Sequence, residues 1–356
     1  MNTMRTARRG APPAPSAPPS RSLISVVKDL LGQTSGLTFV ALVVMIIYFS
    51  LMEPGKFNTT SNFDLLAQNV SILIVLSVGA TFVIATSGID LSIPAAVVLG
   101  EVFATKALGW FTVGEGTAVD VTESETKFSY IAVALLAALA AGLIIGTVNG
   151  LVVAYMRVPP LLATLGTLGS GLGAANLMQD GSNTATSALA PVTSGEAVPG
   201  ISNIVLIAII VVALGWVAVR YSVFGRHTLA IGSNEEAARR VGIKVERHLV
   251  KVYVLAGLAS AFGGFLSVSF FGTTSLAGHM TDNMQAITAV ALGGTSVFGG
   301  VATMLGTLIG ACIPSLLKNG FVIMGVGAYW QDVAIGFVLV LTVWFDQMRR
   351  KARTKH

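Results

Sequence analysis

The side chains that most often carry catalysis or bind metals are few in this chain. Its histidines, His227, His248, His279 and His356, occur singly, and Cys312 is the only cysteine. A single cysteine allows no intramolecular disulfide, and isolated histidines do not form the clusters that are typical of metal sites and active sites. We therefore expect neither a metal site nor a catalytic site.

Nucleotide chemistry is not expected in the chain itself. The sequence has no Gly-x-x-x-x-Gly-Lys-[Ser/Thr] loop, the motif that binds nucleotide phosphates through backbone amides and a lysine. Its pI is about 9.4, but the basic residues lie in short segments that flank apolar runs. This distribution is typical of membrane orientation rather than of a nucleic-acid-binding face.

Five polar residues lie within or beside long apolar runs. These are Asp90, Asn149, Thr164, Thr167 and Thr295. Polar groups inside a membrane are costly and often functional, so these five are candidates for lining a substrate pathway. The alternative for each is a hydrogen bond that packs one helix against another. Glu101 and Lys106 add charge to another apolar run, where they either reach toward the interface or pair with each other.

A charged island, AIGSNEEAARRVGIKVER, occupies residues 230–247. Ser233 or Asn234 can cap a helix whose first turn carries Glu235 and Glu236 and whose last turn carries arginines, and Gly242 can end it. The pattern predicts a helix of about two turns. Because isolated helices this short are marginal in water, we expect it to dock against another surface, with Ala237 and Ala238 allowing close approach. The alternative is an ordinary amphipathic connector.

The elements that must position these residues are membrane spans. Hydrophobic residues make up 53% of the chain and charged residues only 11%, against roughly 25% charged in soluble domains. The sequence predicts an all-α, polytopic transmembrane helical bundle of about ten spans. We place them at 36–52, 67–86, 91–109, 129–154, 160–178, 201–219, 250–271, 284–299, 301–318 and 329–347.

The distribution of Lys and Arg predicts the orientation of these spans. Basic residues gather at the N-terminus, at 220–251 and at 349–355, and an even number of spans puts all three on the cytoplasmic side. We expect a disordered basic tail with a possible interfacial helix over 1–35, and a transmembrane domain over 36–347 that includes a cytoplasmic coupling segment at 220–250. A basic cytoplasmic tail over 348–356 would end the chain.

Glycine and broken segments give two further expectations. Gly142, Gly146 and Gly150 repeat every fourth residue, as do Gly169 with Gly173 and Gly306 with Gly310, a spacing that favours close helix packing. The apolar pattern is interrupted at 86–94 and at 291–306. Each interruption predicts either a short turn at the membrane surface or a half-helix near a pathway.

Several blocks of sequence resemble the ribose-type sugar permeases of ATP-binding-cassette (ABC) importers. GSNEEAARRVGI resembles the short cytoplasmic helix that inserts into the ATPase subunit in that family, with Ser233 in place of a second glycine. Further blocks that resemble the family, in its order, are GIDLS (88–92), GTVNGLVVAYMRVPPLLATLGTL (146–168), GGTSVFGG (293–300), LGTLIGA (305–311) and YWQDVAIGFVLVLTVWFD (329–346). Pro94, Glu101 and Lys106 depart from the family pattern.

The resemblance implies a non-enzymatic permease subunit in the bacterial cytoplasmic membrane. Its expected partners are a cytoplasmic ATPase that binds ATP and Mg, an extracytoplasmic solute-binding protein, a second permease subunit and membrane lipid. The ATPase contact would involve Asn234, Glu235, Glu236, Ala237, Ala238, Arg239 and Gly242, with the glutamates meeting basic groups of the ATPase. A sugar is the expected solute. Branched-chain amino acids or nucleosides are the alternative within the superfamily, and an ion-coupled secondary transporter is the alternative outside it.

Overall fold

The computed structural model describes residues 34–112 and 128–353, and this part of the chain is built from helices without a strand. The all-α bundle expected from the sequence is confirmed. Its long helices are α2 (Thr34–Met52), α3 (Thr60–Ala85), α4 (Ile93–Thr112), α5 (Phe128–Ala154), α6 (Pro160–Met178), α8 (Asn203–Tyr221), α11 (Val245–Phe271), α13 (Met304–Ile323) and α14 (Ala328–Arg353). Four shorter helices are α7 (Pro191–Ser194), α9 (Val223–Ser233), α10 (Glu235–Arg240) and α12 (Asp282–Leu292). The predicted helix before residue 34 lies outside the described residues.

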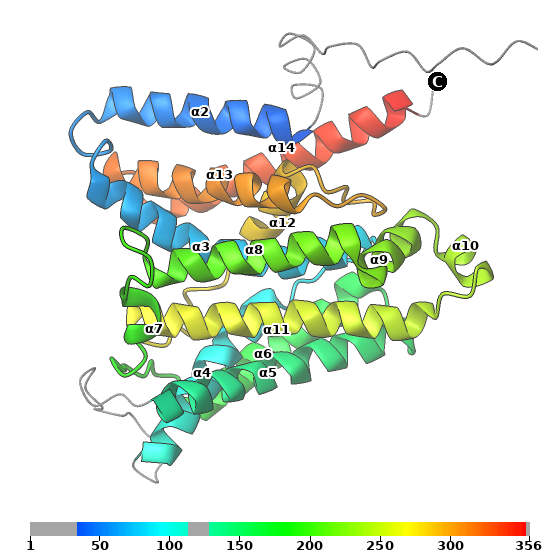
Figure 1. The fold of residues 1–356 in the computed structure, drawn as a ribbon, viewed down its shortest axis with the longest axis horizontal. Coiled ribbons are helices and arrows are strands. Elements are labelled where there is room, and N and C mark those ends of the chain that lie inside the picture. The colour runs from blue at the N-terminus through cyan, green and yellow to red at the C-terminus, as the bar shows by residue number, and fades with distance from the viewer. Residues whose placement is uncertain (1–33, 113–127, 354–356) are drawn as a thin grey trace, which may run out of the picture.

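The long helices lie side by side, and the short ones lie at the ends or in the middle of the bundle (Figure 1). Helices α9 and α10 form one end, and α7 lies at the other. The C-terminal end of α14 points toward the α10 end. Helix α14 continues to Arg353, so the predicted basic tail begins as part of this helix.

Within the described residues, seven helices are long and apolar enough to cross a membrane: α3, α4, α5, α6, α8, α11 and α13. Two further apolar helical segments, Gly36–Met52 and Tyr329–Trp344, are shorter. The eighth predicted span, 284–299, differs most from the structure. There, α12 is an 11-residue helix of about 16 Å, too short for a hydrocarbon core of about 30 Å, and an irregular segment follows it. The half-helix alternative is therefore the better description of this region.

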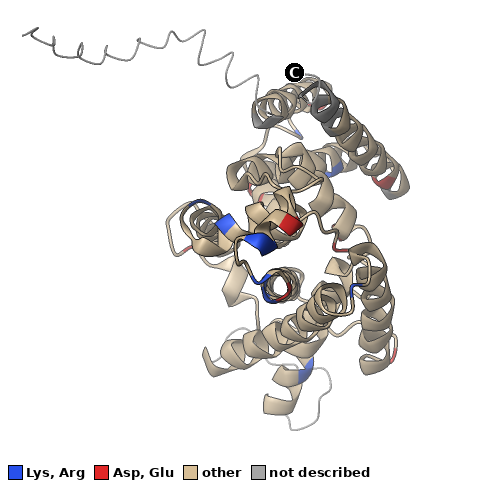
Figure 2. Cartoon of the chain, turned by 90° about the vertical axis from the view of Figure 1, so that its right-hand side faces the viewer, with Lys and Arg blue, Asp and Glu red and all other residues tan. Residues whose placement is uncertain are grey.

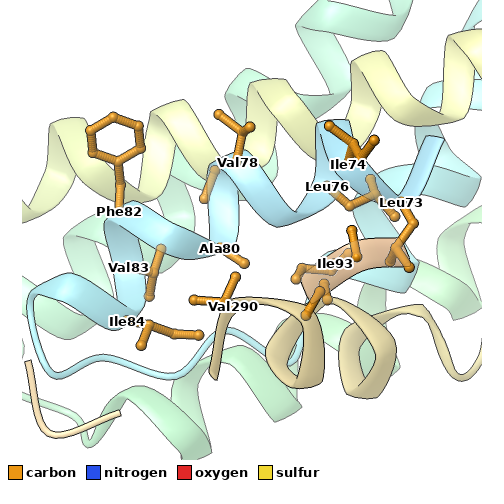
Figure 3. Close-up of a cluster of buried hydrophobic side chains, with 14 of the residues drawn as sticks. Leu73, Ile74, Leu76, Val78, Ala80, Phe82, Val83, Ile84, Ile93 and Val290 are labelled. Carbon is orange, nitrogen blue, oxygen red and sulfur yellow. The ribbon is translucent and has the colours of Figure 1, made fainter. Parts of the chain in front are cut away.

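Helix α3 is the centre of the hydrophobic core. Its residues from Val70 to Ala85 are all buried, because α11, α13, α8 and α12 surround it. Figure 3 shows Ala80, Val83 and Ile84 of α3 beside Val290 of α12, with Ile93 of α4 near the other end of the cluster. A helix that is apolar on every side lies either in a protein core or in lipid, and the neighbours of α3 place it in the core.

Glycine brings α5 and α11 into backbone contact, as predicted. A Cβ atom placed on Gly142 would lie 2.4 Å from the carbonyl oxygen of Gly257, and one on Gly146 would lie 2.5 Å from that of Tyr253. Gly306 and Gly310 of α13 pack equally closely against the backbone of Gly293 and Ala289. The prediction is wrong for Gly169 and Gly173, whose positions meet no other part of the described chain within 4 Å.

A buried ionic cluster fixes the connection between α11 and α12 to the side of α4. Glu101, which is fully buried, accepts a hydrogen bond from the Ser275 amide at 2.7 Å, and its other oxygen lies 2.9 Å from His279 Nε2. His279 Nδ1 lies 2.7 Å from Asp282. Glu101 therefore pairs with His279 and not with Lys106, and His279 is not an isolated histidine. No group of His, Cys, Asp and Glu in the described residues has the geometry of a metal site.

Candidate functional site

The charged island forms the end of α9 and the whole of α10, two short helices that follow one another at one end of the bundle. Asn234 alone separates α9 from α10, and it caps both helices. Its backbone amide donates to the Ala230 carbonyl at 3.1 Å and closes α9, while its side-chain oxygen accepts from the Ala237 amide at 2.9 Å and opens α10. A cap of this kind stabilises a helix by about 1 kcal/mol. The predicted helix start is thus confirmed, with Asn234 rather than Ser233 as the cap.

Helix α10 ends as its sequence predicts. Gly242 has a φ of 86°, a left-handed conformation that glycine adopts without strain. Its amide donates to the Arg239 carbonyl at 3.0 Å, and the Ile243 amide donates to the Ala238 carbonyl at 3.1 Å. These two bonds define a Schellman motif, which is accompanied by contact between Ile243 and Ala238.

The two glutamates of α10 are paired within the chain. Glu235 lies 2.7 Å from Arg239, which also contacts Glu246, and Glu236 pairs with Arg240. The hydrogen bonds that Arg239 donates to Glu235 and Glu246 raise the pKa of its guanidinium, so this side chain stays charged. Exposed pairs of this kind contribute only about 0.3–0.5 kcal/mol each. The glutamates are therefore not free acidic groups, but breaking these weak ion pairs to form new ones with a partner protein would cost little free energy.

Of the residues predicted to contact a partner, Ala238 faces the protein interior. The exposed Val241 was not among the predicted residues. Ala238 is buried against Ile231 and Val245, so the expectation that it leaves room for a partner is wrong, whereas Ala237 is exposed. Val241 follows α10 directly, and 78% of its surface is exposed. An exposed valine at the tip of a charged segment is an apolar contact point. Its position just before the helix-ending glycine is the only sequence signal that could have indicated it.

The end of α9 is in backbone contact with both broken segments. A Cβ atom on Gly232 would lie 1.9 Å from the carbonyl oxygen of Ala85, at the end of α3, and 2.7 Å from the amide of Gly300. That amide donates to the same Ala85 carbonyl at 3.0 Å. The Ser87 hydroxyl lies 2.7 Å from the Phe298 carbonyl and 3.2 Å from that of Gly232. We call this contact of 85–87, 232 and 298–300 the backbone junction.

Four of the five candidate pathway residues meet in one buried network. Asp90 accepts hydrogen bonds from the amide and hydroxyl of Ser92, and Asn149 of α5 donates to the Ser92 hydroxyl at 2.7 Å. Thr167 of α6 donates to the Asn149 side-chain oxygen at 2.6 Å. The hydroxyl of Thr164, also on α6, accepts from the Leu91 amide at 3.0 Å. The network joins segment 86–92 to α5 and α6.

The fifth candidate, Thr295, lies elsewhere. It is buried in the irregular segment after α12, where its amide donates to the Val290 carbonyl and its hydroxyl accepts from the Thr303 amide at 3.1 Å. It therefore shapes the segment that reaches the backbone junction. All five residues are engaged in hydrogen bonds inside the protein, which agrees with the packing alternative for each.

A cavity of about 600 Å³ separates α10 from the ends of α3 and α5. Glu235 and Arg239 line it from α10, Ser87 and Gly88 from the first broken segment, and Arg157 from the α5–α6 connection. Figure 2 looks onto this end of the bundle, where blue and red ribbon is concentrated near the middle of the view and most of the surrounding helices are tan. The charged island thus projects beyond an otherwise apolar bundle.

Comparison with known proteins identifies the family. Residues 62–343 match the family described as the branched-chain amino acid transport system permease component. Over 318 residues the chain is 33% identical to the ribose import permease protein of Escherichia coli, with 88% of this chain and 94% of the relative covered. It is 32% identical to the galactose/methyl galactoside import permease protein of Haemophilus influenzae (90% and 96% covered) and 32% identical to the fructose import permease protein of Rhizobium meliloti (88% and 85% covered).

No solved structure matches the chain. The match to the permease family covers most of the sequence and includes α10, the backbone junction and the buried network. The three relatives named above are each matched over at least 85% of their own length, and all are import permeases. This chain belongs to the family of permease components of branched-chain amino acid transport systems and is a multi-pass membrane subunit of a transporter rather than an enzyme.

Proposed function

We propose that this chain is the permease subunit of an ABC importer that carries a sugar into the bacterial cytoplasm. The observation that carries the proposal is a capped, exposed, charged helix joined by backbone contacts to both broken segments of an apolar bundle. The relatives support the choice of solute, because their names specify ribose, galactose or methyl galactoside, and fructose.

The contact with the ATPase is made by α10 and its two caps. Asn234, Glu235, Glu236, Ala237, Arg239 and Gly242 form the exposed surface of this contact, and Val241 adds an apolar point to it. Ala238 supports the helix from inside. When the ATPase subunits close on ATP and Mg, they move α10, and the backbone junction passes this movement to segment 86–92 and to the segment after α12.

The importer needs partners that this chain does not supply. ATP and Mg bind to the ATPase, and an extracytoplasmic binding protein delivers the solute. Two permease subunits, identical or sister chains, match the two ATPase domains, since closed symmetry gives each domain one coupling helix. The basic segments anchor the α10 end of the bundle at the cytoplasmic face of the lipid bilayer.

A second candidate solute follows from the family description, which names branched-chain amino acids. A chain that carries amino acids would differ from a sugar permease in the residues of its transport route and not in its coupling segment. Uptake of labelled leucine against labelled ribose, galactose and fructose separates the two solutes. An ion-coupled secondary transporter, the alternative outside the superfamily, would give α10 no role.

The experiment that tests the proposal is a pull-down of the tagged permease from its native membrane. We expect an ABC ATPase to co-purify with the wild type and to be lost with Glu236→Arg, because this change puts a like charge beside Arg240 and leaves α10 with three arginines and one glutamate in place of a balanced set. The control is Asp64→Arg, an equivalent change at an exposed position of α3. A wild-type protein that brings down no ATPase, or a Glu236→Arg variant that binds it normally, would overturn the coupling assignment.

A further inference from the structure

A second cavity lies at the end of the bundle opposite α10. Its volume is about 330 Å³, which is within the range of roughly 300–1,000 Å³ found for small-molecule sites. It is formed by the first half of α3, the end of α11, the start of α12 and the last part of α13. None of the five candidate pathway residues lines it.

The polar groups of this cavity come from three segments. Asn69 lines it from α3. His279 and Asp282 line it from the start of α12 and the residues before it, and Gln285 lies one turn further along α12. Ser315, Lys318 and Asn319 lie on α13. The Gln285 amide donates to the Thr281 hydroxyl at 3.1 Å and keeps its oxygen as an acceptor. In the described part of the chain, Ser315 and Lys318 have no side-chain hydrogen-bond or ion-pair partner. The cavity thus offers an ammonium group, a hydroxyl, an amide oxygen and a carboxylate within one small space.

The charges around the cavity balance. Burial lowers the pKa of His279, but its hydrogen bonds to Asp282 and Glu101 outweigh burial and raise the pKa to about 10, so the ring is an imidazolium at neutral pH. The carboxylates of Glu101 and Asp282 oppose the cations of His279 and Lys318, which leaves no net charge on these four groups. A cavity of this kind does not select a solute by net charge.

The remaining lining is apolar. Leu66, Leu73 and Leu76 of α3 and Phe271 at the end of α11 complete the wall. A sugar ring has hydroxyl groups around its edge and C–H groups on its faces, so it needs hydrogen-bonding groups on one side of a site and apolar surface on another. The polar residues of α12 and α13 and the leucines of α3 supply these two surfaces.

We infer that this cavity is a transit site for a neutral, polyhydroxylated solute, held by Gln285, Ser315 and Lys318 with His279 and Asp282 as fixed supports. The inference rests on the proposed importer function and adds to it the place where the permease itself contacts the sugar. The ionic cluster of Glu101, His279 and Asp282 holds the start of α12 in position, and the side chains without partners on α13 make the contacts that change when the solute arrives.

Accessibility from outside the cell is the first test. Cys312 is the only cysteine, so Cys312→Ser gives a cysteine-free background in which Leu66→Cys places one thiol at the partly exposed wall of the cavity without removing a polar group. We expect a membrane-impermeant thiol reagent to label this variant in intact cells and D-ribose, D-galactose or D-fructose to slow the labelling severalfold. Val241→Cys, at the opposite end, should be labelled only in inverted vesicles. Absence of labelling at position 66, or labelling that none of the three sugars slows, would overturn the site.

Uptake separates failure of the site from failure of the importer. Cells that carry the wild type should take up one of the three labelled sugars, and Lys318→Met and Ser315→Ala should each reduce this uptake at least tenfold while the ATPase still co-purifies. Lys56→Met is the matched control, because Lys56 is an exposed lysine that pairs only with Glu53. Normal uptake by both cavity variants refutes the site alone. A wild type that binds no ATPase and takes up none of the sugars refutes the importer on which the site depends.

Discussion

Gly232→Ala tests the backbone junction directly, because this glycine has no room for a methyl group. The new Cβ would lie 1.9 Å from the carbonyl oxygen of Ala85, and ordinary contact begins at 3.4 Å. The end of α9 must therefore separate from the end of α3 by about 1.5 Å. Both neighbouring atoms belong to the backbone, so no side-chain rotation can relieve the overlap.

The expected cost combines two effects. Forcing one methyl group into a closely packed site costs about 1–3 kcal/mol. The same separation strains the bond from the Gly300 amide to the Ala85 carbonyl, and a buried hydrogen bond contributes about 1 kcal/mol. We expect the variant to be less stable than the wild type by about 2–4 kcal/mol and to transport little solute. It should still bind the ATPase, since the caps of α10 at Asn234 and Gly242 are untouched.

The assay is thermal unfolding of the purified permease in detergent, combined with the pull-down and with sugar uptake. Gly336→Ala is the control, because it also adds a methyl group to a helical glycine but meets nothing within 4 Å in the described chain. A Gly232→Ala variant as stable and as active as Gly336→Ala would refute the close contact of α9 with α3. A stable Gly232→Ala variant that no longer binds the ATPase would refute the idea that α10 binds the ATPase while the backbone junction only transmits its movement.

Three further predictions concern the cap, the buried network and the ionic cluster. Asn234→Ala should lower the stability of α10 by about 1 kcal/mol and weaken ATPase capture in the pull-down, whereas Asn234→Asp should retain both, since aspartate also caps helices; equal capture by the two variants would exclude a role for the cap. Asn149→Leu should cost about 1–3 kcal/mol in thermal unfolding because it removes two buried hydrogen bonds, one donated to the Ser92 hydroxyl and one accepted from the Thr167 hydroxyl, and an unchanged unfolding temperature would mean that the network contributes nothing. The pKa of His279 is raised from 6.5 in the unfolded chain to about 10, so its contribution to stability is complete below pH 6.5 and is lost as the pH rises toward 10. The groups that face it are Glu101, Asp282, the Ser267 hydroxyl and, across the cavity, Lys318. The wild type should therefore lose stability between pH 7 and pH 10 more steeply than His279→Gln, and parallel curves would contradict the ionic cluster.

The ends of α10 could be predicted from the sequence because they depend on neighbouring residues. Asn234, Gly242 and the order of the charges between them act within one or two helical turns, and each adopts the expected geometry. The spacing of Gly142, Gly146 and Gly150 likewise indicated that α5 would pack closely against another helix, which the structure identifies as α11. The sequence could not show which helix they would meet, and it indicated the same packing for Gly169 and Gly173, which meet nothing within 4 Å among residues 34–112 and 128–353.

The features that sequence reasoning missed depend on how the helices pack against one another. Glu101 and His279 are 178 positions apart, whereas Lys106, the partner considered from the sequence, lies in the same apolar run. The inward position of Ala238 depends on Val245, which only the fold brings beneath α10. Segment 284–299 was predicted as a span because it is apolar, but apolar residues also line the interior of a bundle, and composition alone does not separate the two cases.

The ionic cluster of Glu101, His279 and Asp282 also restricts how this sequence can diverge. Replacing one member alone leaves a buried charge without its partner, which costs about 3–5 kcal/mol, whereas replacing the cluster together with an apolar set removes that penalty. Natural substitutions at these three positions should therefore occur jointly, so that homologues carry either the complete set or none of it. Covariation between positions on α4 and at the start of α12 would be the evolutionary record of this contact.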